Sequence, residues 1–206
     1  VMLTATLGFI VFFEDQKNRT HQQFLYFSLL TAIWGILNYT SYKVSEAELA
    51  FVLLRLTIFA VTWQTLSFLF FTLAFPGDRF AIPRYVPIAL LVLASGVSFL
   101  TLTPLVFSGI GSLSSSGRII SVVNGPAVPL FGMTTVGFAV AGIFIFFIKM
   151  WRAVSSQRMA HRPVAIGLLG MFALVTTSNF FLPVFSNNVD YIPFGALFVF
   201  PFIILT

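Results

Sequence analysis

The 206-residue chain is 58% apolar and only 8% charged, with a mean hydropathy of +1.00 and a formal net charge of +5. Soluble domains carry roughly 25% charged residues, so this composition excludes an ordinary water-soluble fold. The chain has no cysteine, which excludes disulfides and thiolate metal sites, and its basic residues form no run with interleaved aromatic residues, which argues against nucleic acid as a partner.

Seven apolar blocks follow one another along the chain. Lipid cannot satisfy exposed backbone N–H and C=O groups, so we expect each block to form a transmembrane helix. A helix needs about 20 apolar residues to span the hydrocarbon, and the first and last blocks are shorter, so both terminal helices are expected to be truncated. The predicted fold is all-α, a polytopic transmembrane bundle of seven helices in one domain over residues 1–206, with helices at about 1–13, 24–42, 50–75, 85–107, 127–150, 164–185 and 192–206.

The basic residues predict the orientation of these helices. Three of them, Lys43, Arg55 and Arg118, lie towards one side of the predicted bundle, and the other eight lie in or around the alternate connections. Cytoplasmic connections carry the excess of Lys and Arg, so we expect the N-terminus outside the cell and the C-terminus in the cytoplasm. The expected location is the inner (plasma) membrane, which the chain crosses several times. The eight residues are Lys17, Arg19, Arg79, Arg84, Lys149, Arg152, Arg158 and Arg162.

The longest connection runs from Ser108 to Pro126 and is rich in glycine and serine. It falls on the predicted outer side, where such a composition indicates a flexible loop or a lid.

Arg55 is the only basic residue placed within an apolar block and away from the end of that block. Inserting a charged residue at the middle of a transmembrane helix is unfavourable by up to roughly 3 kcal/mol. One interpretation is an arginine that extends to the outer headgroups. The other pairs it with Glu46, Glu48 or Asp190, or with an anionic ligand. Both interpretations stay open from the residues alone.

Asn38 and Asn179 are predicted at a depth similar to that of Arg55, and Asp190 is predicted in the outer connection between the last two blocks. Together with Arg55 they form the candidate ligand-binding cluster. The alternative is ordinary interhelical hydrogen bonding, which Asn, Ser and Thr often provide in membrane bundles. Gln64, near the middle of the third block, likewise needs a partner because lipid cannot satisfy its amide.

No catalytic or metal-binding set is visible. His21 and His161 have no second ligand at metal spacing, and no glycine-rich phosphate loop or nucleophile motif occurs. We therefore expect no enzyme activity in this chain, no catalytic residue, no metal and no cofactor.

Several short motifs stand out along the chain, namely Asn18-Arg19-Thr20 with Phe24 and Trp34, Arg55, the run from Phe70 to Pro76, the run from Asn179 to Pro183, and Ile192-Pro193-Phe194-Gly195. In these motifs the sequence resembles the N-terminal seven-transmembrane region of bacterial membrane histidine kinases over nearly its whole length. The resemblance implies a receptor-like sensor that detects an extracellular or membrane-borne signal and relays it to a cytoplasmic kinase domain in cis, in a two-component system. It also implies membrane lipids and an unknown small-molecule or lipid ligand as partners, and leaves a homodimer open.

The second function considered is a subunit of a small-molecule transporter or channel. Such a protein needs a polar path through the middle of the bilayer. The apolar blocks contain no acidic residue at mid-helix, so the sequence favours the sensor. An enzyme embedded in the membrane ranks last, because it needs clustered reactive groups at one depth.

Overall fold

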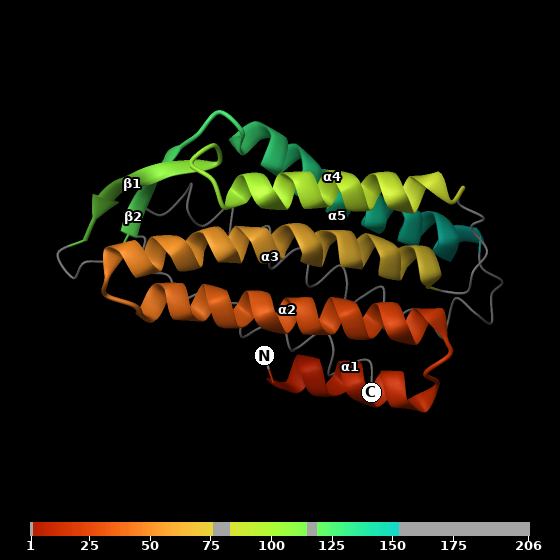
Figure 1. The fold of residues 1–206 in the computed structure, drawn as a ribbon. Helices are drawn as coiled ribbons and strands as arrows, with labels where there is room; N and C mark the ends of the chain where they lie inside the picture. Colours follow the sequence, from red (N-terminus) through yellow and green to blue (C-terminus); the bar gives the residue numbers. More distant parts are fainter. Residues whose placement is uncertain (1, 76–82, 115–118, 153–206) are drawn as a thin grey trace.

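A computed structural model describes residues 2–75, 83–114 and 119–152 of the chain. Its described part contains five helices and one β-hairpin (Figure 1). In chain order the elements are α1 (Met2–Glu14), α2 (Arg19–Lys43), α3 (Ala47–Ala74), α4 (Tyr85–Thr101), β1 (Phe107–Leu113), β2 (Ile119–Asn124) and α5 (Val128–Arg152).

The helical prediction is confirmed for the first five apolar blocks, each of which holds one helix. The second helix begins at Arg19, five residues before the predicted start, because Asn18 caps it: the Asn18 side-chain oxygen accepts the Thr20 backbone N–H at 2.9 Å. The predicted helices at 164–185 and 192–206 lie outside the described residues.

The fourth helix ends at Thr101, six residues before the predicted end, and the following connection is not a simple loop. Strands β1 and β2 pair antiparallel over most of it, with register irregularities along the ladder. The prediction of an all-α fold therefore missed this hairpin. Gly125 closes its base, since a Cβ there would lie 2.1 Å from the Leu105 carbonyl oxygen and no other residue fits.

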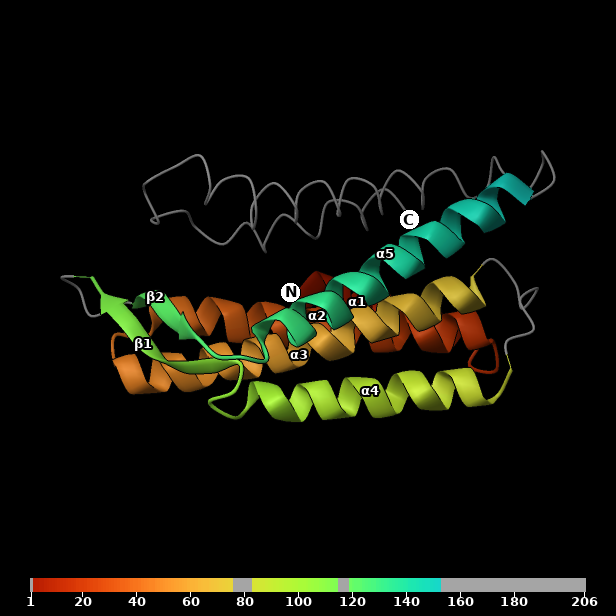
Figure 2. The same ribbon diagram turned by 90° about the horizontal axis from the view of Figure 1, so that it is seen from above.

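The helix α3 is the central rod of the bundle. It packs against α2 on one side and against α4 and α5 on the other, while α1 packs on the far side of α2 (Figures 1 and 2). Its 28 residues give a length of about 42 Å at 1.5 Å per residue. This rod therefore connects the hairpin at one end of the molecule with the α1–α2 turn at the other.

Glycines permit close helix approach at two places. A Cβ on Gly8 of α1 would lie 2.7 Å from the Cβ of Ser28 on α2, and one on Gly142 of α5 would lie 2.8 Å from the ring of Phe68 on α3. Leu66, Leu69, Ala94 and Phe138 form the core between α3, α4 and α5, and buried Phe27 and Phe68 join α2 to α3.

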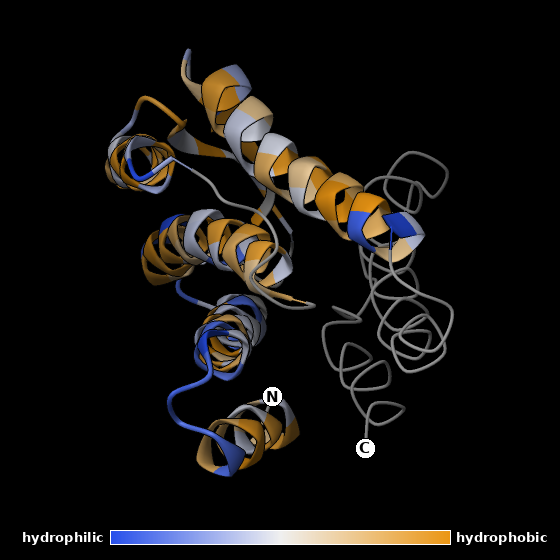
Figure 3. Ribbon diagram, turned by 90° about the vertical axis from the view of Figure 1, so that its right-hand side faces the viewer, coloured by the Kyte–Doolittle hydropathy of each residue, from blue (hydrophilic) through white to orange (hydrophobic). Residues whose placement is uncertain are grey.

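Among the helices that the structure describes, α3 and α5 are long and apolar enough to cross a membrane. Large apolar side chains also remain exposed on the bundle surface, for example Ile88, Val92 and Phe99 on α4, at 61, 67 and 68%. Figure 3 shows hydrophilic residues concentrated at the α1–α2 turn and at the end of α5, with apolar colour along the helices between. An apolar flank with polar ends is the pattern that a bilayer favours.

Candidate functional site

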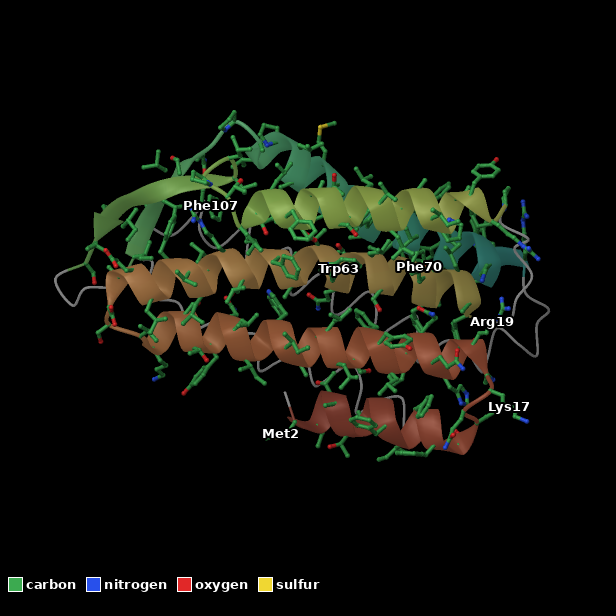
Figure 4. All side chains as sticks on the ribbon, viewed as in Figure 1. Met2, Lys17, Arg19, Trp63, Phe70 and Phe107 are labelled. Carbon is green, nitrogen blue, oxygen red and sulfur yellow. The ribbon has the colours of Figure 1, made fainter. Side chains whose placement is uncertain are left out.

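Two ends of the described bundle differ in chemistry. The hairpin end holds β1, β2 and the start of α3, and Phe107 marks it in Figure 4; the basic end holds the α1–α2 turn with Lys17 and Arg19. Arg84 and Arg152 belong to the basic end too, and all four of these cations are exposed.

Arg55 is the charged residue at the hairpin end around which a site is built. It lies two turns into α3, is half-buried, and its Nη2 donates a hydrogen bond to the Phe107 carbonyl oxygen at 2.6 Å. Its Cζ atom also lies 4.5 Å from the centroid of the Phe51 ring, within the range of a cation–π interaction. Arg55 therefore joins the central helix to the first residue of the hairpin.

Within the described part of the chain, the Nε–H group of Arg55 is not used as a donor. Its Nε atom is buried and has no hydrogen-bond partner among the residues described. Leaving a buried donor unsatisfied costs about 1–3 kcal/mol, and more for a charged group. Neither of the predicted partners Glu46 and Glu48 forms an ion pair with Arg55 here; both are exposed at the start of α3.

Of the other three residues of the predicted cluster, the structure describes only Asn38. Asn38 is half-buried on α2, and within the described chain no hydrogen bond joins its side chain to Arg55; its backbone carbonyl accepts the Ser41 hydroxyl at 2.7 Å. Asn179 and Asp190 lie outside the described residues.

Gln64 has the partner that its depth requires. Its Nε2 donates to the Thr31 hydroxyl at 3.1 Å, and that hydroxyl donates in turn to the Phe27 carbonyl at 2.7 Å. The amide thus links α3 to α2, which is the packing role expected for polar groups within a membrane bundle.

Lys149 is the residue whose role the sequence interpretation missed, because its charge near the end of the predicted helix 127–150 was treated only as a topology signal. It lies within α5 and is only 6% exposed. Its ammonium donates to the carbonyl oxygens of Leu73 and Phe75, the latter at 3.0 Å. These carbonyls end α3, where helix C-termini leave unsatisfied acceptors and a partial negative charge.

The neighbouring carbonyl is also taken. The Thr20 hydroxyl, at the start of α2, donates to the Ala74 oxygen at 3.0 Å. Three helices therefore meet at the last carbonyls of α3. The helical spacing contained a signal for this: Lys149 follows Phe138, Gly142 and Phe146 at intervals of four, four and three residues, which places it on the buried face of α5.

Aromatic rings extend the same junction. The Phe71 ring stacks on that of Phe75 with centroids 5.5 Å apart, and Phe75 stacks on Phe146 of α5 at 6.2 Å. Phe24 and Phe27 of α2 lie 5.7 and 6.3 Å from Phe71. The end of α3 is thus held by aromatic contacts and hydrogen bonds from α2 and from α5.

Comparison with known proteins gives one match. The family model described as "N-terminal 7TM region of histidine kinase" matches residues 1–206. No curated protein and no solved structure gives a significant match. The family match and the two helices long enough to span a membrane, α3 and α5, together indicate a membrane protein. Because the match covers the whole sequence, the chain belongs to the family of N-terminal seven-transmembrane regions of histidine kinases.

Proposed function

We propose that this chain is the sensory input region of a histidine kinase, a multi-pass part of the plasma membrane with its hairpin end outside and its basic end in the cytoplasm. The observation that carries the proposal is the family match over residues 1–206. A cytoplasmic kinase domain in cis receives the output, and the 206 residues themselves carry out no catalysis.

The architecture supports a relay along α3. The contacts at the hairpin end include the hydrogen bond of Arg55, and those at the basic end include the hydrogen bonds to the Leu73 and Phe75 carbonyls; both sets belong to the same helix. A signal that shifts or rotates α3 at one end therefore reaches α2 and α5 at the other. Helix shifts of about 1–2 Å are a common form of such switching.

A signal can shift this equilibrium only through a difference in its affinity for the two arrangements. The outer polar cluster, centred on Arg55 and Asn38, is the place where we propose that this difference arises. The transporter alternative receives no support from the described helices, because their carboxylates occur only at helix ends and in turns.

Cysteine labelling tests the orientation, because the chain has no cysteine of its own. Ser112 in β1 and Lys17 in the α1–α2 turn are both exposed, so Ser112→Cys and Lys17→Cys are a matched pair from opposite ends. We expect a membrane-impermeant maleimide to label Ser112→Cys in intact cells and Lys17→Cys only after permeabilisation. The reverse pattern contradicts the proposed orientation.

The signalling role is tested in the full-length protein. Autophosphorylation measured in reconstituted membranes should change when the outer end is perturbed by Arg55→Lys, and should not change with Lys43→Met, which removes a cation from the same end without touching the hairpin. A full-length protein with no phosphotransfer activity in any variant overturns the proposed kinase output.

A further inference from the structure

The guanidinium of Arg55 has a geometry that its present contacts do not complete. In any arginine the Nε–H and one Nη2–H point in the same direction along one edge, and this edge fits two oxygens of a carboxylate or phosphate. In Arg55 the Nη2 atom donates to the Phe107 carbonyl at 2.6 Å, while Nε is buried and unpartnered within the described structure. Of the two nitrogens that form an oxyanion-binding edge, Nη2 therefore donates a hydrogen bond in this structure and Nε does not.

Nearby groups hold this edge in place. The Phe51 ring lies 4.5 Å from Cζ and restricts the tilt of the guanidinium plane. The two closest acidic residues in sequence, Glu46 and Glu48, are exposed and form no ion pair with Arg55.

We propose that Arg55 is the receptor for an oxyanion, a carboxylate or a phosphate group, that competes with the Phe107 carbonyl and releases the hairpin from α3. This inference rests on the proposed sensor function and names the ligand class of the same site. A charged oxygen is a stronger acceptor than an amide carbonyl, and two oxygens engage both donors where the carbonyl engages one. Binding therefore exchanges one hydrogen bond to a neutral carbonyl for two hydrogen bonds to a charged oxyanion.

The hairpin stays attached when this exchange occurs. At its base the Gly125 N–H donates to the Val106 oxygen at 2.7 Å, and the Ala127 N–H donates to the Leu105 oxygen at 2.8 Å. Val106 is fully buried. The freed hairpin thus moves about a fixed base, and the hydrogen bond from Arg55 of α3 to the Phe107 carbonyl of β1 is lost.

The oxyanion can come from two sources with the same chemistry: the phosphate of a lipid headgroup in the outer leaflet, or a soluble carboxylate or phosphate. The test uses the full-length protein with a spin label on Ser112→Cys, whose mobility reports the hairpin. In maltoside micelles, inorganic phosphate or acetate is titrated against chloride at equal ionic strength. In a second arm the protein is placed in phosphatidylglycerol nanodiscs without soluble oxyanion.

We expect phosphate or acetate, but not chloride, to raise the label mobility of the wild type to saturation, and Lys43→Met to behave alike. Arg55→Lys keeps the charge but lacks the two-donor edge, so it should need at least about tenfold more anion. Arg55→Met should be mobile from the start and insensitive. Mobility already raised in the nanodiscs assigns the headgroup as the source; mobility that rises only with added anion assigns the soluble ligand.

An unresponsive wild type in both arms, or an Arg55→Lys response equal to that of the wild type, overturns the inference. Autophosphorylation separates this failure from that of the sensor itself. If phosphate frees the hairpin without changing autophosphorylation, the site stands and the sensor proposal fails. If autophosphorylation responds equally in the wild type and in Arg55→Lys, the sensor stands and the Arg55 site is wrong.

Discussion

Lys149 gives the clearest test of how the bundle is held together at its basic end. Its ammonium supplies donors to two carbonyls of α3, and the side chain is nearly completely buried. Replacement by methionine keeps the length and the apolar stem but removes both donors. The Leu73 and Phe75 carbonyls then lose their hydrogen-bond donor, and water cannot easily replace it at a buried position.

The magnitude follows from two opposing terms. A hydrogen bond to a charged group contributes about 1.5–3 kcal/mol, so two such bonds contribute about 3–6 kcal/mol. Methionine also removes the desolvation penalty of a buried ammonium, which amounts to several kcal/mol and offsets part of the loss. We therefore expect Lys149→Met to lower the free energy of unfolding by about 2 kcal/mol, a 30-fold change in the ratio of folded to unfolded protein.

Reversible unfolding in mixed micelles titrated with dodecyl sulfate measures this difference. Arg152→Met is the matched control, because Arg152 lies one turn further along α5 and is exposed. It should stay within about 0.5 kcal/mol of the wild type, as surface substitutions usually do. Equal stability of Lys149→Met, Arg152→Met and the wild type would refute the reasoning. Lys149→Arg, which keeps charge and donors, should recover most of the loss.

Two further predictions concern packing and polar contacts between helices. Gly142→Ala places a Cβ 2.8 Å from the Phe68 ring and should destabilise the bundle by about 1–3 kcal/mol. The control Gly137→Ala, whose added Cβ meets nothing within 4 Å, should be neutral or slightly stabilising. Equal thermal unfolding temperatures of the two variants would contradict the close approach of α5 to α3. Gln64→Leu removes the hydrogen bond to Thr31 and should cost about 0.6 kcal/mol, the average for such bonds in membrane bundles. A loss above about 2 kcal/mol in the same dodecyl sulfate titration would show that Gln64 does more than join α2 to α3.

The helices of the described region follow from hydropathy. Each of the first five apolar blocks became a helix, because a backbone in lipid must satisfy its own hydrogen bonds and only local pairing is needed for that. The family resemblance was likewise present in the residues themselves and is confirmed by the match over residues 1–206.

The hairpin could not be predicted in the same way. Its strands combine glycine and serine with short apolar runs, a composition shared by flexible loops. Strand pairing joins residues well separated along the chain, for example Phe107 and Asn124, and the bulges hide any regular alternation. The pairing of β1 with β2 and their contacts with α3 are visible only in the tertiary structure.

The predicted site shows the same division. The sequence identified Arg55 as an unusual charge, because its position in an apolar block depends on local composition alone. It did not identify the Phe107 carbonyl as the partner, and it treated Lys149 as a topology signal although that residue binds the end of α3. Hydropathy reports the solvent that each residue prefers, whereas a hydrogen-bond partner is a property of two segments brought together. The sequence alone thus determined the membrane character, the first five helices and the family, and the tertiary structure decided which groups the buried charges bind.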